Sequence, residues 1–317
     1  MASPMELFIW RGDWGLPSVH TDSLTALAYA RFAGAPLKVH KLSNPWRSPS
    51  GTLPALKTEQ GLCLQPLQML EYFKKQGYNA DYRLSVKESA DTLAFISLIN
   101  EKLLPALIYT FWVDAKNYVS LTRPWFANTI PFPLSLYLPN RLHERHLEQL
   151  QLRLGSQALN SEEETEAQIL DEASECLTLL SQRLASQSFF FGDSPSSLDA
   201  VVFGHLAPLL KAKLPNSKLQ QHLQLLDNLC GFCNTVLSLY FPTEHTDTVS
   251  DTRRSAAPCE TDEDPHKRRN QVLSVLVGLV AMLGYAFLSG ILSIKRVSAR
   301  GALPAANRLT EEGDEEE

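Results

Sequence analysis

The sequence predicts an α+β protein with a small sheet-containing part, an all-helical part and a single transmembrane helix near the C-terminus. Short apolar runs alternate with helical patterns over residues 1–80, whereas only helical patterns occur from about Ser85 onward. A charge-free stretch of membrane length begins at Val272. These observations divide the chain into segments 1–80, 85–240, 241–270, 271–294 and 295–317.

The composition excludes several classes of protein. A net charge of -6 at pH 7 argues against a nucleic-acid partner. The 5 cysteines are an odd number scattered over a long chain, which is not the pattern of a secreted disulfide framework and indicates a reducing compartment. The N-terminal "MASPMELFIW" shows neither a secretory leader nor an Arg-rich transit peptide.

The first segment is predicted to run β-α-β and then β-β-α. Strands are expected at 5–10, 37–39, 53–56 and 62–64, and helices at 22–32 and 66–76. This order is thioredoxin-like. In that arrangement a proline that starts the third strand usually follows a cis peptide bond, so Pro54 is predicted to be a cis-proline.

The second segment is predicted to be helical throughout. One helix is expected over 91–109, with a kink where Pro105 interrupts the backbone bonding. The proline-rich "IPFPLSLYLPN" (130–140) reads as a connection to the next helices. Ser161 and Glu164 form a capping-box pattern before an apolar helical repeat that extends to Leu184.

The stretch "FFFGDSPSSLDA" (189–200) identifies the fold of this segment. Ser196 and Asp199 have the spacing of a capping box, in which each side chain bonds the other residue's backbone N–H. The helix that follows is apolar on nearly every face, so it is expected in the middle of a bundle, where its first N–H groups need such partners. Together with the thioredoxin-like half, the motif resembles the glutathione S-transferase fold.

The residues that a glutathione transferase needs are absent or compromised. Ser18 is the one plausible hydroxyl after the first strand, and a role as helix cap is favoured for it. Gln65-Pro66 stands where an acid–serine pair should hold the γ-glutamyl group, and proline offers neither hydroxyl nor N–H. Cys230 and Cys233 have redox-motif spacing but are expected inside a helix, as core residues. No catalytic, cofactor or metal site is predicted.

The apolar stretch 271–294 is predicted to be a tail anchor, because the ribosome releases a span this close to the C-terminus only after synthesis ends. Its moderate hydropathy and basic flanks favour the mitochondrial outer membrane. The polar segment 241–270 is expected to be a disordered tether. Marker positions of the span are Val272, Gly278, Gly284, Gly290 and Ile294. The flanking basic residues are Lys267, Arg268, Arg269, Lys295 and Arg296.

Several longer stretches, among them "YARFAGAPLKVHKLSNPWRSPSGTLPAL" and "EKLLPALIYTFWVDAKNYV", resemble the metaxin family over residues 1 to about 240. The resemblance implies a glutathione-transferase-like domain that faces the cytosol, with a short tail in the intermembrane space. It further implies a non-enzymatic subunit of the sorting and assembly machinery. Its implied partners are metaxin 2 and the β-barrel core subunit, with a link to the cristae-organising complex and no cofactor.

Two hypotheses remain open from the sequence. The first is an interaction protein of the kind just described, and the second is a tail-anchored, glutathione-dependent transferase of the outer membrane. The partner-binding face is also open, because Trp14, Trp46, Trp112 and Trp125 suit either a core or a contact surface. Trp46 lies in the turn-rich loop 44–51, where packing into the core is favoured for it.

Overall fold

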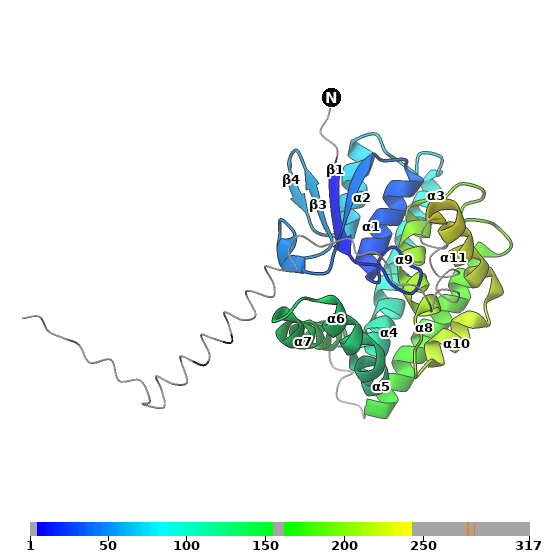
Figure 1. The fold of residues 1–317 in the computed structure, drawn as a ribbon. Coiled ribbons are helices and arrows are strands. Elements are labelled where there is room, and N and C mark those ends of the chain that lie inside the picture. Colours follow the sequence, from blue (N-terminus) through cyan, green and yellow to red (C-terminus); the bar gives the residue numbers. More distant parts are fainter. Residues whose placement is uncertain (1–4, 155–161, 243–277, 279–281, 283–317) are drawn as a thin grey trace, which may run out of the picture. The chain divides into compact units, whose positions relative to one another are not determined.

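A computed structural model describes residues 5–154 and 162–242, together with Gly278 and Met282 (Figure 1). Residues 1–257 form one compact unit and residues 258–317 a second. Of the predicted anchor, Gly278 is described, and it is helical and exposed. The other anchor and flanking positions lie outside the described residues: Val272, Gly284, Gly290, Ile294, Lys267, Arg268, Arg269, Lys295 and Arg296.

A four-stranded mixed sheet opens the first unit, with the strand order β2-β1-β3-β4. Its strands are β1 (Met5–Trp10), β2 (Leu37–Leu42), β3 (Ala55–Thr58) and β4 (Gly61–Cys63). β1 pairs in parallel with β2 and antiparallel with β3, which is the pairing of a thioredoxin-like sheet. β3 begins two residues later than predicted. The Leu53–Pro54 bond is cis, and Pro54 has no N–H to give to the ladder, so the strand starts after it.

Two helices accompany the sheet: α1 (Thr21–Phe32) and α2 (Pro66–Lys75). Every residue from Ser23 to Ala30 is buried, because α1 lies between the sheet and α9 (Ser197–Lys211) (Figure 1). A helix covered on all sides needs small or apolar residues around its whole circumference, and "SLTALAYA" has them. α1 is therefore the central element that joins the sheet to the helical part.

The first long helix of the helical part differs from its prediction at both ends. It begins with α3 (Val86–Leu98), because Ser85 and Glu88 form a capping box before the expected start. It continues past Pro105 through η2 (Ile99–Leu103), α4 (Leu104–Ile108) and η3 (Tyr109–Val113). η2 is π-helical and its wider turn places Pro105 at the start of α4, where a missing N–H costs little.

Residues 86–113 are long and apolar enough to cross a membrane, and they are the one such stretch in the described part of the chain. Ile99, Leu103 and Ala106 are fully buried within the folded unit. The hydropathy of this stretch therefore reflects its place in the core of the unit.

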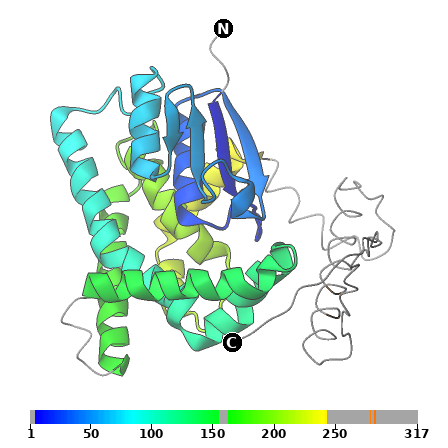
Figure 2. The same ribbon diagram turned by 90° about the vertical axis from the view of Figure 1, so that its left-hand side faces the viewer.

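The proline-rich stretch 130–140 is not the connection that the sequence predicts, because most of it is helical. After α5 (Ala115–Asn117), η4 (Tyr118–Thr122) and α6 (Arg123–Thr129), the helix α7 spans Leu134–Leu154 and includes Pro139. Pro139 lies in the second turn, so it removes one backbone bond near the end of a 21-residue helix. α7 runs across one end of the other long helices (Figure 2).

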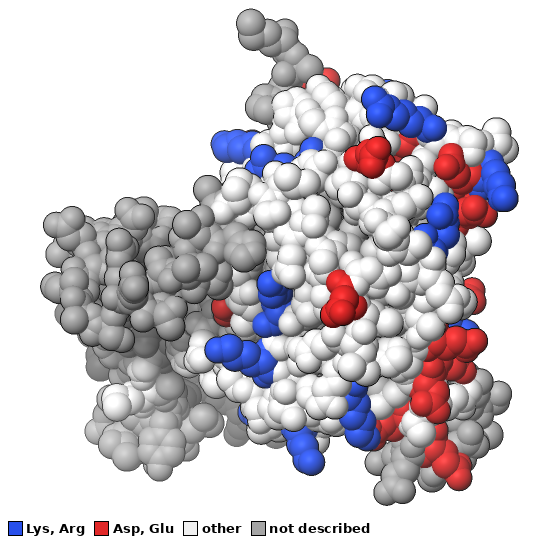
Figure 3. Space-filling model, turned by 90° about the vertical axis from the view of Figure 1, so that its right-hand side faces the viewer, with Lys and Arg blue, Asp and Glu red and all other residues white. Residues whose placement is uncertain are grey.

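Four helices complete the unit: α8 (Glu162–Leu184), α9, α10 (Lys218–Gln224) and α11 (Asp227–Tyr240). Ser161, of the predicted capping box before α8, lies outside the described residues. Seen from the side of α10 and α11, charged side chains are sparse across the middle of the surface and acidic ones gather along one edge (Figure 3). This face therefore presents mostly uncharged surface.

One continuous core joins the sheet to the helices. Leu7 of β1, Leu24 of α1, Leu177 of α8 and Phe203 of α9 all belong to it and are fully buried. α1 and α9 lie close together at Gly204, since a Cβ there would lie 2.2 Å from Thr25 Oγ1. The two helices can touch only because this position has no side chain.

Candidate functional site

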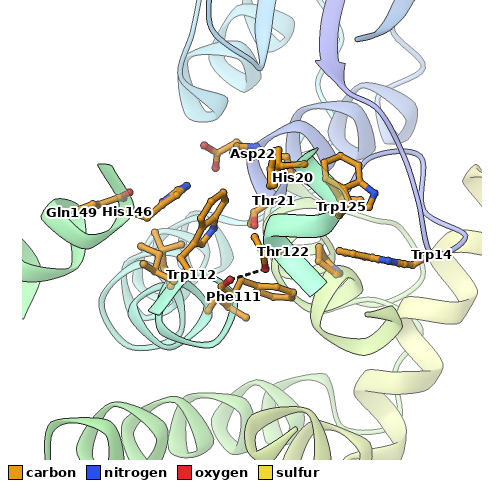
Figure 4. A pocket seen from close by; sticks show the side chains of 16 residues that line it. Trp14, His20, Thr21, Asp22, Phe111, Trp112, Thr122, Trp125, His146 and Gln149 are labelled. Atoms are coloured by element: carbon orange, nitrogen blue, oxygen red, sulfur yellow. Dashed lines mark hydrogen bonds between the residues drawn. The ribbon is translucent and has the colours of Figure 1, made fainter. Parts of the chain in front are cut away.

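A cavity of about 140 Å³ lies between the β1–α1 connection and the helices of residues 104–149 (Figure 4). Its walls combine aromatic and aliphatic side chains, and α4 supplies Leu104, Leu107 and Ile108. The aromatic lining residues are Trp14, Phe111, Trp112, Trp125 and Phe126. A concave apolar site with a few polar groups is the common form of a binding site for a small group.

The β1–α1 connection has a backbone that holds Trp14 at the cavity. A Cβ on Gly12 would lie 2.1 Å from the Leu16 carbonyl oxygen, so the loop can close only with glycine there. Trp14 itself has a φ of 55°, an uncommon conformation for a bulky residue. Its N–H donates to Asp13 Oδ1 at 2.7 Å, which stabilises this conformation.

Two hydrogen-bond donors at the cavity are already engaged. Trp125 Nε1 donates to Asp13 Oδ2 at 2.6 Å, and this bond ties α6 to the β1–α1 connection. Thr122 Oγ1 donates to the Phe111 carbonyl oxygen at 2.6 Å (Figure 4). Neither donor is available to a ligand.

Two imidazoles from distant parts of the chain meet at the cavity. His20 immediately precedes α1, and its carbonyl accepts the Leu24 N–H at 3.0 Å. His146 comes from α7 and stacks on Trp112, with the ring centroids 4.3 Å apart. Burial lowers the pKa of His20, which Asp22 partly opposes, and burial lowers the pKa of His146 to about 4. Both rings are therefore neutral at pH 7.

The positions that bind glutathione in this fold are altered. Ser18 is fully buried, and its hydroxyl accepts the His20 N–H at 3.3 Å. The sequence predicts Ser18 as the N-cap of α1, and this prediction is wrong. The helix starts three residues after Ser18, and His20 is its N-cap. Gln65 is the N-cap of α2 without a side-chain bond, and Pro66 is its first residue. The start of α2 therefore offers neither a hydroxyl nor the N–H of residue 66 to a carboxylate.

The cysteine pair is placed differently from its prediction, although it remains unreactive. α11 begins at Asp227, so Cys230 lies in the first turn and not in the middle of a helix. Burial raises the pKa of both thiols, Cys230 and Cys233, and neither forms a thiolate at pH 7. Within residues 5–154 and 162–242, no group of three or more metal-ligating side chains comes together.

Ser196 and Asp199 are brought together at the start of α9. Asp199 Oδ2 accepts the Ser196 N–H at 2.8 Å and the Ser196 hydroxyl at 2.6 Å, while Oδ1 accepts the Phe190 N–H at 3.0 Å. Burial raises the pKa of Asp199 to about 6, and these hydrogen bonds partly offset the shift. Asp81 adds a second carboxylate, which accepts from the Ser197 N–H and hydroxyl at 2.7 and 2.8 Å.

Trp46 is 57% exposed, which corrects the prediction that it packs into the core. The Asn44 side chain accepts the Trp46 N–H at 2.9 Å, so a tight turn directs the ring outward.

Sequence reasoning did not identify the cavity. In the sequence, Trp14, Trp112 and Trp125 suit either a core or a contact surface, and His20 and His146 have no recognisable partner. No spacing signal connects them, because they lie on separate elements that only the tertiary fold brings together.

Curated relatives match the chain over its whole length. It is 58% identical over 318 aligned positions to Metaxin-1 of Sus scrofa and of Mus musculus, and the match covers 100% of each chain. It is 50% identical to Metaxin-3 of Danio rerio over 87% of both chains. The chain belongs to the metaxin family.

Two family models match parts of this metaxin. Residues 23–143 match the family described as outer mitochondrial membrane transport complex protein, and residues 173–236 match the glutathione S-transferase C-terminal domain. The family and the first of these models indicate a component of a transport complex at the mitochondrial outer membrane.

Solved structures show the fold of this metaxin. A glutathione S-transferase of Ceriporiopsis subvermispora, solved with glutathione, has a TM-score of 0.50 at 15% identity, covering 81% of this chain and 100% of that one. A β-etherase of Sphingobium has a TM-score of 0.50 at 14% identity, covering 78% and 99%. The folded part is therefore glutathione S-transferase-like.

Proposed function

We propose that this metaxin is a non-enzymatic subunit of the machinery that sorts and assembles β-barrel proteins in the mitochondrial outer membrane. It acts with metaxin 2 and with the barrel-shaped core subunit, and the same assembly contacts the cristae-organising complex. The folded unit faces the cytosol, the anchor 271–294 spans the membrane, and residues 295–317 lie in the intermembrane space. Family membership and the matched outer-membrane model support this proposal.

The start of α2 is the observation that carries the non-enzymatic part of the proposal. Pro66 occupies the first position of that helix and Gln65 makes no side-chain cap bond. A glutathione carboxylate would meet a pyrrolidine ring where it needs donors, so the main substrate anchor is missing. Ser18 is fully buried, so its hydroxyl is not exposed to a glutathione thiolate either.

The role in β-barrel assembly is testable by complementation. In mammalian cells that lack Metaxin-1, expression of this chain is expected to restore the assembly of newly imported β-barrel proteins, and metaxin 2 is expected to co-purify with it after crosslinking. The Ser18→Ala variant is expected to restore assembly equally. Normal membrane insertion of the chain without restored assembly or metaxin 2 recovery would refute the proposal.

The glutathione-dependent alternative is tested by calorimetry on the full chain in lipid nanodiscs. We expect no heat of binding with millimolar glutathione. A Gln65→Glu/Pro66→Ser double variant rebuilds the acid–serine pair and serves as the control that the measurement detects restored binding. Wild-type binding at millimolar or tighter affinity, with turnover lost in Ser18→Ala, would establish the enzyme instead.

A further inference from the structure

The polar groups of the aromatic cavity include unpaired acceptors. Asp22 lines the cavity, and no Lys or Arg of the described residues forms an ion pair with it. The Nδ1 atoms of His20 and His146 are buried and have no hydrogen-bond partner in the described part of the chain. Two donors nearby, Trp125 Nε1 and the Thr122 hydroxyl, are already taken. The cavity therefore favours a group that donates hydrogen bonds.

The charge of the lining favours a cation. At pH 7 Asp22 is the one formally charged side chain among the described residues that line the cavity, since His20 and His146 are held neutral by burial. His146 Nδ1 is buried without a partner, and it is an acceptor when the neutral ring carries its proton on Nε2. A lone carboxylate in an apolar setting attracts a positive group more strongly than one in open water.

The aromatic walls suit the same kind of group. Trp14, Trp112 and Trp125 approach the cavity from the β1–α1 connection, η3 and α6 (Figure 4). Indole faces attract cations through the ring quadrupole, and guanidinium groups also stack on them through their flat shape. Figure 4 shows His20, Asp22, Trp112 and His146 converging on the same space.

We propose that this cavity binds the guanidinium group of an arginine side chain, presented by a polypeptide that docks on the folded unit. A volume of about 140 Å³ is sufficient for one arginine side chain. The guanidinium is planar and carries five donors, so it pairs with Asp22 and the ring nitrogens while its faces contact indole. A quaternary ammonium, such as a choline headgroup, has no N–H for these acceptors. The choice of a polypeptide rests on the proposed function, whereas the guanidinium chemistry does not.

A purely structural role of Asp22 makes a different prediction. An acidic residue in the first turn stabilises a helix through its dipole, and Asp22 is in the first turn of α1. That role affects the stability of the chain and leaves cation binding unaffected. Asp227 is also in the first turn of its helix, α11, but does not line the cavity, and it provides a matched control.

The test uses the full chain in lipid nanodiscs, with the indole N–H signals of its tryptophans followed by NMR. The probes are Nα-acetyl-arginine amide, its neutral isostere Nα-acetyl-citrulline amide, and tetramethylammonium. We expect saturable shifts with the arginine probe, and at least tenfold weaker binding of the other two. Since this measurement needs no partner, a failure of β-barrel assembly and a failure of arginine binding are separate results.

The variants decide which groups are responsible. Asp22→Asn is expected to weaken arginine binding at least tenfold, and Asp227→Asn to leave it unchanged. His146→Phe keeps the stacking on Trp112 and removes one acceptor, so it should weaken binding several-fold even if Asp22→Asn proves unstable. Equal binding of the citrulline probe, or wild-type affinity in both Asp22→Asn and His146→Phe, would overturn the guanidinium site. Tetramethylammonium binding as tight as the arginine probe would assign the cavity to a lipid-type cation and overturn the polypeptide ligand.

Discussion

Asp199 and Glu88 are the acidic residues of two capping boxes with opposite exposure. Asp199 is fully buried and accepts three hydrogen bonds, two from Ser196 and one from the Phe190 N–H. Glu88 accepts from the N–H and hydroxyl of Ser85 at an exposed helix start. Because an unpaired buried donor costs far more than one that water reaches, the same motif has a different energetic weight in the two places.

Replacing these residues by alanine tests that difference. Asp199→Ala is expected to lower the free energy of unfolding by about 2–4 kcal/mol, because it leaves buried donors without partners. Glu88→Ala is expected to lower it by much less, since water replaces the carboxylate at this exposed helix start. Urea unfolding of the detergent-solubilised chain, followed by circular dichroism, measures both. Equal losses in the two variants would contradict this reasoning.

His146 makes stability depend on pH in a defined window. Its pKa falls from 6.5 to about 4 on folding, so between pH 6.5 and pH 4 the unfolded chain binds more protons and the folded state loses stability as pH falls. His146→Phe keeps the ring contact with Trp112 and removes this proton uptake. We expect the variant to lose less stability than wild type between pH 7 and pH 4, by on the order of 1–3 kcal/mol.

Asp199 has the opposite sign in this window. Its folded pKa of about 6 lies above the ordinary 3.8, so its protonation stabilises the folded state as pH falls. Both wild type and His146→Phe contain Asp199, and the difference between them isolates the histidine. An identical pH dependence of the two melting temperatures would show that His146 titrates normally in the folded chain.

At the scale of elements, the contact between α1 and α9 leaves no room for a side chain at position 204. A Cβ at position 204 would lie 2.2 Å from Thr25 Oγ1 and 2.9 Å from the Thr21 carbonyl oxygen. Backbone atoms cannot move aside as a flexible side chain does, so the helices would have to separate. Gly231 of α11 is also within a helix, but nothing lies within 4 Å of a Cβ there.

Two glycine substitutions test this contact. Gly204→Ala is expected to destabilise the chain by about 1–3 kcal/mol through overpacking. Gly231→Ala is expected to stabilise it by about 0.5–1 kcal/mol, because alanine favours the helix and meets no neighbour. Differential scanning calorimetry of the two variants gives the comparison. A stabilising effect of Gly204→Ala would mean that α1 and α9 are not in contact at this position.

Element types could be predicted from the sequence better than element ends. The apolar run of β1 and the encircling apolar pattern of α9 carry strong local signals, and both elements appear as expected. The predictions for 91–109 and 130–140 are wrong at their prolines. A π-helical turn places Pro105 at the start of α4, and Pro139 lies near the start of α7, so the helices tolerate both residues. Hydrogen bonding of that kind depends on the folded surroundings and leaves no local pattern.

The cavity was still less predictable than the elements. Its side chains come from the β1–α1 connection and from helices that include α1, α4, η3, α6 and α7, so no window of the sequence contains them together. By contrast, the altered start of α2 was visible from Gln65-Pro66 alone, because proline chemistry is local. The loss of a site can thus be inferred from one position, whereas a new site needs the tertiary structure.

At the scale of the whole molecule, the proposed anchor is testable by its charge tolerance. A positive charge in the middle of a membrane helix costs about 2.5–3.5 kcal/mol on insertion scales. Gly284→Arg is therefore expected to shift part of the chain from the carbonate-resistant membrane fraction to the soluble one, while Gly313→Arg, in the acidic tail, changes nothing. Deletion of 271–317 is expected to leave a soluble protein with an unchanged melting temperature, since residues 1–257 form a compact unit.

Complete release of the unaltered chain by carbonate would contradict the anchor. Membrane retention after the deletion would mean instead that a partner holds the folded unit at the surface. Fluorescence microscopy of both chains in cells separates these outcomes from degradation.

The packing of α1 against α9 also limits when the chain can complete its core during translation. α1 leaves the ribosome early, yet the surface it needs for burial is supplied by α9, which is translated much later. Until then, "SLTALAYA" exposes apolar side chains that its own sheet covers on one side only. The nascent metaxin therefore cannot complete the burial of α1 until α9 has been translated, up to residue 211.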